Sequence, residues 1–353
     1  MNISLILTKQ CNLRCQYCFE THENVYMTEE TALKAMDLAV SHHDRSVGVS
    51  FFGGEPLLCK PLIYKCVEYS KRFKDIKFSW NMTTNGLLLD EEFLTFARDN
   101  GIEIAMSHDG LMSRINRVYP DGSDCLDRLD EKLALLLRYQ PSAFIMATTT
   151  ADTAGDVFGS VRYLFERGVK RLNLAIDSRP CAGWDETGMK ELSGQLQMVG
   201  DFVFEQFCRG RDVYFIPFEE KILSITKDRA CHVCRLGWRK PYIDWDGLIY
   251  PCIQFGGAAA FRIGTVTEGI HQERRDSIYQ SSLKKPEICT DCALQKRCVN
   301  DCACINYQQS GDMSQVSGEQ CAFQRLLIER ADEMARKMLA ADEKHFTARY
   351  LAK

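Results

Sequence analysis

Short apolar runs alternate with longer amphipathic segments along the first half of the chain. Each apolar run ends at turn-forming residues and is too short for a helix, which is typical of buried strands. Between these runs, apolar side chains recur at helical spacing, as Leu33, Met36 and Ala39 do. Asp90 is placed to cap a helix that ends at Gly101. The predicted strands are residues 3–7, 47–52, 76–83, 102–107, 143–148 and 171–176.

This repeated order of strand and helix predicts a parallel sheet with helices on its outside. About six such units fit before residue 180, fewer than the eight of a closed barrel. We therefore expect an α/β fold, a partial (β/α)6 barrel of the TIM type. Functional residues of parallel sheets gather at the carboxyl ends of the strands. Motifs at such ends are Gly53-Gly54-Glu55-Pro56, Asn85-Gly86 and Ser107-His108-Asp109-Gly110.

The character of the chain changes after the barrel. A long amphipathic helix is predicted over residues 186–207, and a cysteine-rich stretch begins after Arg229. A charged helix that carries apolar Leu327 and Met334 follows toward the end. The predicted domains are a barrel at 1–185, a bridging helical region at 186–229, a second domain at 230–325 and a C-terminal helix at 326–353.

Composition excludes several classes of protein. The net charge of −4 argues against nucleic-acid binding driven by phosphate neutralisation. No apolar run approaches the ~20 residues of a membrane span, and no secretion signal is found at the N-terminus. The 17 cysteines are an odd number in a long chain, which argues against a secreted disulfide scaffold. We expect a cytoplasmic protein whose clustered cysteines bind metal or act in catalysis.

Three cysteines lie on one loop directly after the first predicted strand. Cys11, Cys15 and Cys18 are one thiolate short of the four that a 4Fe–4S cluster needs. An iron left without a protein ligand can bind a small molecule instead. The CxxxCxxC spacing, with Tyr17 before the last cysteine, resembles the signature of the radical S-adenosylmethionine (SAM) enzymes. The resemblance implies that the open iron chelates SAM and that Tyr17 lies near its adenine.

The Gly53-Gly54-Glu55-Pro56 motif resembles the segment with which that family binds the amino group of SAM. Two glycines let a backbone approach a ligand closely, although Gly-Gly at a strand end is also a common turn. The resemblance implies further contacts, with the ribose and carboxylate of SAM, from Asn85, Ser107 and Asp109. A turn-forming role is the alternative for each of these three. Arg114 and Arg117 follow at a spacing that departs from the family, so neither is assigned.

A second set of cysteines lies in the last third of the chain. Cys234 is followed by Gly247 and Cys252, and Asp246-Gly247 has the sequence of a hairpin turn. Then come Cys289, Cys292, Cys298, Cys302 and Cys321. These separations resemble the SPASM domain of the peptide-modifying radical SAM enzymes.

The resemblance divides these ligands between two auxiliary 4Fe–4S clusters, which makes three clusters in total. It implies that the distal cluster is held by Cys289, Cys292, Cys298 and Cys321. It implies that the cluster nearer the barrel is held by Cys234, Cys252 and Cys302, with Cys231 as the fourth ligand. Tetrahedral zinc is the alternative, because CxxC pairs also suit that ion. Cys304, two residues after a ligand, is placed to substitute for one or to approach the substrate.

By this resemblance the protein is an enzyme that modifies a ribosomally synthesised precursor peptide. A 5′-deoxyadenosyl radical from SAM would abstract a hydrogen atom from the peptide, and the auxiliary clusters would accept an electron. A near-barrel cluster with four protein ligands cannot bind a substrate thiolate, which favours a carbon–carbon crosslink over a thioether. The sequence does not identify the base. An expected partner is a reductant such as flavodoxin or ferredoxin. Because only ten residues precede Cys11, we expect either a separate leader-binding protein or recognition of the peptide by the barrel mouth and the C-terminal helix.

Other reactions stay open. Anaerobic sulfatase-type formylglycine maturation uses an Asp directly after the cysteine that matches Cys252, where this chain has Ile253 and Gln254. Peptide epimerisation needs a hydrogen donor such as Cys304. Small-molecule dehydrogenation is a further alternative. The non-enzyme alternative is an iron–sulfur electron-transfer protein, against which the intact CxxxCxxC motif argues.

Overall fold

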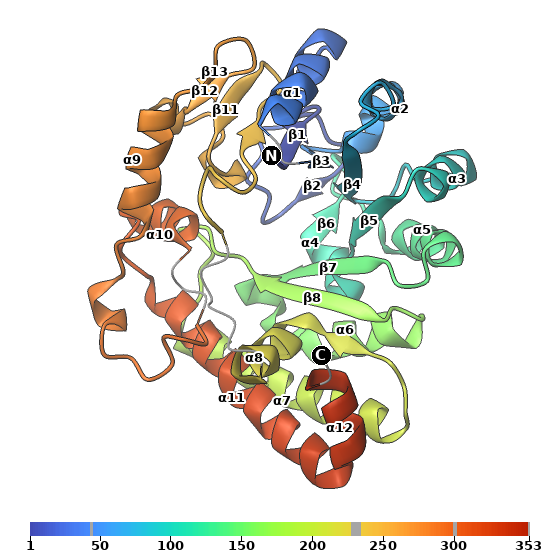
Figure 1. Ribbon diagram of the computed structural model, residues 1–353. Coiled ribbons are helices and arrows are strands. Elements are labelled where there is room, and N and C mark those ends of the chain that lie inside the picture. The colour runs from blue at the N-terminus through green and yellow to red at the C-terminus, as the bar shows by residue number, and fades with distance from the viewer. Residues whose placement is uncertain (43–44, 227–233, 299–301, 352–353) are drawn as a thin grey trace.

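The computed structural model describes residues 1–42, 45–226, 234–298 and 302–351. At its centre the strands pair in the order β13-β12-β11-β10-β1-β3-β4-β5-β7-β8-β9 (Figure 1). Neighbours from β1 to β8 pair in parallel, as expected for β/α units. These strands are β1 (Ile3–Ile6), β3 (Ser46–Phe52), β4 (Lys77–Thr84), β5 (Ile102–Ser107), β7 (Phe144–Thr149) and β8 (Arg171–Ile176).

Helices between these strands cover the outside of the sheet (Figure 1). The Thr28 hydroxyl accepts the N–H of Thr31 at the start of α1, and Asp90 accepts the N–H of Phe93 at the start of α3. The α/β fold with a parallel sheet that the sequence predicts is therefore confirmed. The covering helices are α1 (Glu29–Ser41), α2 (Lys60–Ser70), α3 (Glu91–Asp99), α5 (Leu126–Tyr139) and α6 (Val157–Glu166).

The cysteine-rich region continues the barrel sheet. Strand β10 (Tyr242–Ile243) pairs in parallel with β1, and β11 (Leu248–Tyr250) pairs antiparallel with β10. Gly247 has a φ of +86° between these two strands, so the predicted hairpin turn is present. Two short strands, β12 (Gly264–Thr265) and β13 (Gly269–Ile270), complete this side of the sheet.

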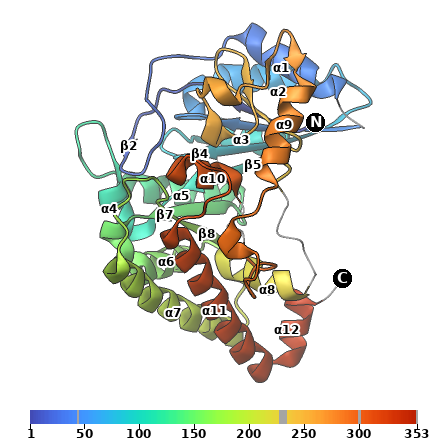
Figure 2. The ribbon, with the colours of Figure 1, turned by 90° about the vertical axis from the view of Figure 1, so that its left-hand side faces the viewer.

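Helices from the second half of the chain lie beyond β8. Helix α11 (Gly318–Ala341) runs alongside α7 (Glu186–Cys208), as Figure 2 shows, and both contain a buried apolar face. Helix α11 begins before residue 326 and contains Cys321, so the cysteine-rich region and the terminal helix overlap. On the same side lie β9 (Tyr214–Phe215), α8 (Ile216–Thr226) and α12 (Glu343–Tyr350), whereas α9 (Gln272–Ser282) and α10 (Ala303–Ser310) lie on the side of β12 and β13 (Figure 1).

Candidate active site

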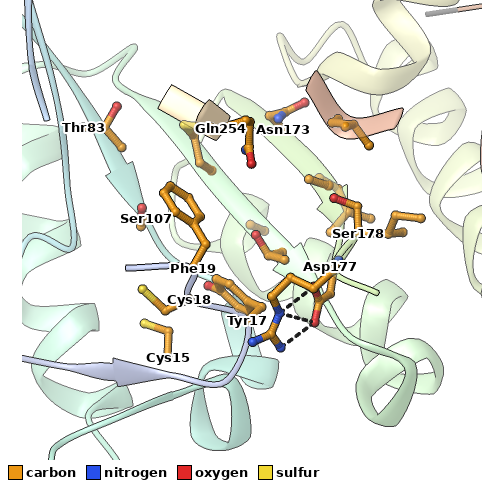
Figure 3. Close-up of a pocket in the computed structure, with 18 of the residues that line it drawn as sticks. Cys15, Tyr17, Cys18, Phe19, Thr83, Ser107, Asn173, Asp177, Ser178 and Gln254 are labelled. Atoms are coloured by element: carbon orange, nitrogen blue, oxygen red, sulfur yellow. Dashed lines mark hydrogen bonds and ion pairs between the residues drawn. The ribbon is translucent and has the colours of Figure 1, made fainter. Parts of the chain in front are cut away.

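A cavity of about 550 Å³ lies at the carboxyl ends of the parallel strands (Figure 3). Its wall consists of the loop after β1 and the ends of β3, β4, β5, β7 and β8, together with parts of α8, α10 and α11. This is the position expected for the site of a parallel sheet. The predicted site residues that line it are Cys11, Cys15, Tyr17, Cys18, Gly53, Gly54, Asn85 and Ser107.

The three cysteines of the first loop share one part of this wall, and Figure 3 draws Cys15 beside Cys18. The N–H of Leu13 lies 3.4 Å from the Cys11 Sγ. Burial raises the pKa of all three thiols, that of Cys11 to about 12. Such thiols become ligands when a metal displaces their protons. Three soft sulfur donors on one wall fit a 4Fe–4S cluster that keeps one iron open.

The two glycines after β3 leave no room for a side chain. Gly53 has a φ of +134°, and a Cβ there would lie 2.3 Å from the carbonyl oxygen of Thr8. A Cβ at Gly54 would lie 2.3 Å from the carbonyl oxygen of Gln10. Instead, the N–H of Gly54 donates to the Thr8 carbonyl at 2.8 Å. The glycines therefore let the end of β3 lie against the cysteine loop, while both still face the cavity.

Glu55 is fully buried and is not among the residues that line the cavity. Its carboxylate accepts hydrogen bonds from the N–H of Leu57 at 2.9 Å, the Thr84 hydroxyl at 2.7 Å and the N–H of Asn85 at 2.8 Å. Burial raises the pKa of Glu55 to about 7, although these hydrogen bonds favour the charged form. In this position Glu55 braces the loop after β3 against the end of β4. Its contact with SAM stays a prediction.

Asn85 links the end of β4 to the cysteine loop. Its side-chain amide donates to Asn12 Oδ1 at 2.8 Å and lies 3.6 Å from the Cys11 Sγ. Its Oδ1 accepts the N–H of Leu87 at 3.0 Å. Ser107 lines the cavity at the end of the next strand, β5. Both residues lie at the same edge of the sheet because adjacent parallel strands end there, and their contacts with SAM stay predictions.

Asp109 forms a buried cluster with Tyr17 and Arg117 beneath the cavity wall. The Tyr17 hydroxyl donates to Asp109 Oδ2 at 2.8 Å, and Arg117 donates to both carboxylate oxygens at 3.0 and 3.2 Å. The N–H of Thr148 also donates to Oδ1, at 2.9 Å. Asp109 is fully buried and does not line the cavity, so its carboxylate is committed to protein groups. Its predicted contact with SAM stays a prediction.

The structure distinguishes the two arginines that the sequence left unassigned. Arg117 lines the cavity, lies 5.4 Å from the centre of the Tyr17 ring and places Nη1 3.7 Å from the Cys15 Sγ. It starts β6 (Arg117–Val118), which pairs with β2 (Arg14–Cys15) of the cysteine loop. Arg114 instead points to the surface and pairs with Asp124 at 3.1 Å. Arg117 therefore lies at the candidate site, a position that spacing alone did not identify.

The part of the wall formed by β8 and α8 carries polar residues that the sequence did not mark. Arg179 donates to Asp177 at the end of β8, with Nη2 and Oδ2 2.8 Å apart (Figure 3). Glu220 of α8 also lines the cavity, and its carboxylate forms no hydrogen bond or ion pair among the described residues. Although Glu220 is exposed, the surrounding protein desolvates its carboxyl and raises the pKa above its ordinary value, and the positive charge of Lys221 partly opposes this rise. No local motif precedes these residues, and only the fold brings them to the cavity.

The four cysteines predicted for the distal cluster surround one small cavity of about 40 Å³. Cys289 ends a short turn, Cys292 and Cys298 follow on the same loop, and Cys321 comes from α11. Ile288, Leu294 and Ile328 supply apolar parts of the wall. Within residues 1–42, 45–226, 234–298 and 302–351, no three His, Cys, Asp or Glu side chains are arranged to hold a metal ion.

The cysteines predicted for the near-barrel cluster are only partly described. Cys234 and Cys252 line a cavity of about 390 Å³, and Cys231 lies outside the described residues. Cys302 is the residue before α10 (Ala303–Ser310), and the neighbouring Cys252 and Cys302 thiols raise the pKa of the buried Cys304 thiol. Cys304 is therefore adjacent to this group, as its position two residues after Cys302 suggested.

Comparison with known families agrees with this geometry. The profile of the Radical SAM superfamily matches residues 5–150, from β1 to just beyond β7. The chain therefore contains a radical SAM domain. The matched range contains the three-cysteine loop, the Gly53-Gly54 pair and Arg117. The domain implies that this radical SAM enzyme uses a 4Fe–4S cluster and SAM as cofactors. The family and the enzyme class that the sequence predicts are confirmed.

Curated relatives extend over most of the chain. A cysteine-type anaerobic sulfatase-maturating enzyme of Clostridium perfringens strain 13 is 26% identical over 332 residues, which cover 86% of this radical SAM enzyme and 89% of the relative. The radical SAM cyclopropyl synthase TigE of Paramaledivibacter caminithermalis is 21% identical over 361 residues, 96% of this chain and 75% of TigE.

Solved structures share the fold. The structure titled native anSMEcpe with bound AdoMet has a TM-score of 0.84 at 21% identity and is matched over 97% of this chain and 99% of its own. Streptococcus suis SuiB bound to S-adenosylmethionine has a TM-score of 0.61 at 20% identity, over 91% of this chain and 74% of SuiB. None of the helices in the described residues combines the length and apolar character needed to cross a membrane.

Proposed function

We propose that this radical SAM enzyme modifies a ribosomally synthesised peptide by oxidative crosslinking. A carbon–carbon crosslink, such as one that closes a cyclophane, is favoured over a thioether. The observation that carries the proposal is the cavity itself. One part of its wall holds the three-cysteine loop, and another, on β8 and α8, holds polar groups that have no role in binding a cluster. A site of this kind holds a second, polar molecule beside the cofactor.

The names of the relatives support a peptide as that molecule. Structures with this fold include anSMEcpe with bound AdoMet and a Cp18Cys peptide, with a TM-score of 0.81, and SuiB bound to precursor peptide SuiA, with a TM-score of 0.63. TigE, a cyclopropyl synthase, matches nearly the whole of this chain. We infer that the same cavity here accepts a peptide segment.

In the proposed site, Cys11, Cys15 and Cys18 hold the SAM-binding cluster, and Gly53, Gly54, Asn85 and Ser107 face the bound SAM. When bound, these cofactors supply the 5′-deoxyadenosyl radical that takes a hydrogen atom from the substrate. Arg117 places a fixed positive charge beside Cys15, and Asp109 holds it there. Tyr17 is oriented by the same carboxylate. These residues position the cofactors and keep the reaction away from water.

Crosslinking removes two hydrogens from the peptide. The first leaves as a hydrogen atom, and the second leaves as an electron and a proton. We propose that the four cysteines that surround the small cavity would hold one auxiliary cluster, and that Cys234, Cys252 and Cys302 with Cys231 would hold another. Such clusters would supply an acceptor for the electron. The shared cavity of the first four cysteines supports their assignment to one cluster.

Glu220 is our candidate for the base that takes the proton. It lines the cavity, it forms no hydrogen bond or ion pair among the described residues, and its raised pKa makes it a stronger base than an ordinary carboxylate. Its neighbour Lys221 is buried and donates instead to Gln324 and to the carbonyl of Arg297. Asp177 is less suitable, because Arg179 occupies both of its oxygens.

The partners of this reaction are proposals on the same basis. A reductant such as flavodoxin or ferredoxin would supply the electron that starts each turnover, in a cytoplasmic setting. A separate leader-binding protein would present the precursor peptide. Neither partner is needed for the test described below, because dithionite and a short peptide replace them.

A second candidate function is formylglycine-type maturation, which the 26% identity to the C. perfringens maturase favours. Against it stands Ile253 after Cys252, where that class carries an Asp. An aliphatic side chain cannot accept a proton, so a different residue would have to act as base. Epimerisation with Cys304 as hydrogen donor and small-molecule dehydrogenation have less support from the relatives.

The test is anaerobic reconstitution with iron, sulfide, dithionite and SAM, together with the peptide encoded by the short reading frame beside the gene. The proposal predicts 5′-deoxyadenosine and a peptide that is lighter by two hydrogens and carries a new bond in its fragment spectrum. A hydrazine-reactive aldehyde in the peptide would support formylglycine formation instead. An unchanged peptide mass, with 5′-deoxyadenosine still formed, would refute crosslinking of this peptide.

A further inference from the structure

The candidate base Glu220 lies on the face of α8 that borders the cavity. Pro217, Glu220 and Lys221 all line the cavity, and residues three and four positions apart lie on one face of a helix. Successive helix residues project about 100° apart, so Glu219 and Lys221 leave α8 on nearly opposite sides, with Glu220 between them. Groups that hold these two neighbours therefore fix the direction in which Glu220 points.

The first of two anchors is a buried ion pair between α8 and the C-terminal helix α12. Arg349 Nη2 donates to Glu219 Oε1 at 2.6 Å, and the Tyr350 hydroxyl donates to the same oxygen at 3.1 Å. The side chains of Arg349 and Glu219 are only 6% and 8% exposed. Figures 1 and 2 both show α12 beside α8. Because both charges are removed from water, the loss of either partner leaves a buried charge without compensation.

Arg349 also holds the segment that leads into α8. Its Nη2 donates to the main-chain carbonyl of Val213 at 2.7 Å, and its guanidinium lies 4.1 Å from the centre of the Tyr214 ring. Strand β9 ends at the residue before Ile216, where α8 begins. One arginine of α12 therefore fixes both the start of α8 and the side of the helix that carries Glu219.

The second anchor holds the other side of α8. Lys221 is buried, and its ammonium group donates to Gln324 of α11 and, at 3.0 Å, to the main-chain carbonyl of Arg297. Arg297 in turn donates to the main-chain carbonyl of Lys221 at 3.2 Å and pairs with Asp332 of α11 at 2.6 Å. Between these anchors Glu220 has no hydrogen bond or ion pair of its own among the described residues, so its direction depends on its neighbours.

Building on the proposed function, we propose that Arg349 and Tyr350 are positioning residues, which act through Glu219 to point Glu220 at the bound peptide. Helix α12 then serves the reaction although none of its residues lines the cavity. Without this anchor, α8 can turn about its axis, and the Glu220 carboxylate moves away from the carbon that loses its proton. The radical still forms, because the cysteine loop and the other strand ends do not depend on α12. The expected defect is therefore 5′-deoxyadenosine without a crosslink.

The experiment compares Arg349→Met with Lys337→Met in the anaerobically reconstituted full chain. Lys337 pairs with Asp201, and because these side chains are 45% and 52% exposed, its loss is the matched control. With the encoded peptide, dithionite and SAM, the measured quantity is crosslinked peptide per 5′-deoxyadenosine. Both products come from the same loaded molecules, so a loss of folded protein cancels from this ratio.

We expect Arg349→Met to lower the ratio roughly tenfold, since a misplacement of about 1 Å can cost an enzyme up to ~100-fold. Arg349→Lys keeps the charge and should recover part of the loss. Tyr350→Phe removes one hydrogen bond and no charge, so it should fold and show a smaller decrease. Lys337→Met should match the wild type.

Hydrogen exchange gives a readout that does not depend on turnover. Deuterium uptake of residues 216–226 should rise in Arg349→Met and stay at the wild-type level in Lys337→Met. Unchanged uptake in Arg349→Met, or an unchanged product ratio in both Arg349→Met and Tyr350→Phe, overturns the inference alone if the wild type crosslinks the peptide. If the wild type forms 5′-deoxyadenosine but no crosslink, the proposed function fails, and the inference fails with it.

Discussion

Replacing Asp109 with Asn is expected to destabilise the fold itself, beyond any effect on SAM. The Arg117 side chain is 6% exposed and that of Asp109 is fully buried, and two hydrogen bonds of 3.0 and 3.2 Å join them. Asn keeps an acceptor for the N–H of Thr148 but removes the negative charge. A buried guanidinium without its counter-charge costs about 3–5 kcal/mol. This is a large part of the ~5–15 kcal/mol that stabilises a typical domain.

The matched control lies a few residues away. Arg114 and Asp124 form a pair at 3.1 Å whose side chains are 58% and 38% exposed. Asp124→Asn keeps the acceptor for the N–H of Leu126 and removes the same charge. Because solvent screens this pair, the expected cost is only about 0–1 kcal/mol. The two variants differ mainly in the burial of the charge.

Urea unfolding of the wild type and both variants, followed by circular dichroism, measures these differences. We expect the midpoint to fall much further for Asp109→Asn than for Asp124→Asn. Adding Arg117→Met to Asp109→Asn should recover part of the loss, because it removes the unpaired charge. Equal midpoints for the two single variants, or no recovery in the double variant, would refute the assignment of Asp109 as the counter-charge of a buried arginine.

Three further predictions follow from the same geometry. Gly54→Ala should abolish SAM binding in calorimetry, because the new Cβ would lie 2.3 Å from a main-chain oxygen of the cysteine loop. The control Gly194→Ala should bind SAM normally, because a Cβ at that position would have no atom within 4 Å. Cys321→Ala should lower the iron content of the reconstituted protein by one third, whereas Cys208→Ala, at an exposed position, should not change it. Glu220→Gln should still form 5′-deoxyadenosine but no crosslink. Glu220 can act as a base only when it is ionised, and its pKa is raised. Crosslinking by the wild type should therefore decline as the pH falls through that raised pKa. Formation of 5′-deoxyadenosine by the Gln variant should not follow this decline.

The sequence predicted those parts of the site that depend on local order. The loop with Cys11, the Gly53-Gly54 turn and Asn85 each directly follow a strand whose apolar pattern is legible. Parallel strands bring such ends to one edge, so the cavity could be expected. The cysteine spacing then identified the family, because three thiols on one loop are rare outside metal sites.

Other parts depend on contacts between residues far apart in the chain. Tyr17 meets Asp109 across 92 positions, and Arg117 meets Cys15 across 102. The position of Glu55 is set by hydrogen bonds from Thr84 and Asn85 at the end of β4, which no local pattern indicates. Pairing of β10 with β1, which joins the cysteine-rich region to the barrel, has no local signal either. Periodicity describes an element and its faces, and it does not say which partner covers a polar group.

The central claim is that the cavity brings a peptide carbon within reach of the radical formed beside Cys11, Cys15 and Cys18. The direct measurement uses the encoded peptide with deuterium at the carbons that become bonded, incubated anaerobically with enzyme, dithionite and SAM. The account predicts one deuterium in the 5′-deoxyadenosine for each crosslinked peptide. If 5′-deoxyadenosine accumulates without deuterium while the peptide gains its new bond, the hydrogen is not taken from the peptide at this site, and the account is contradicted.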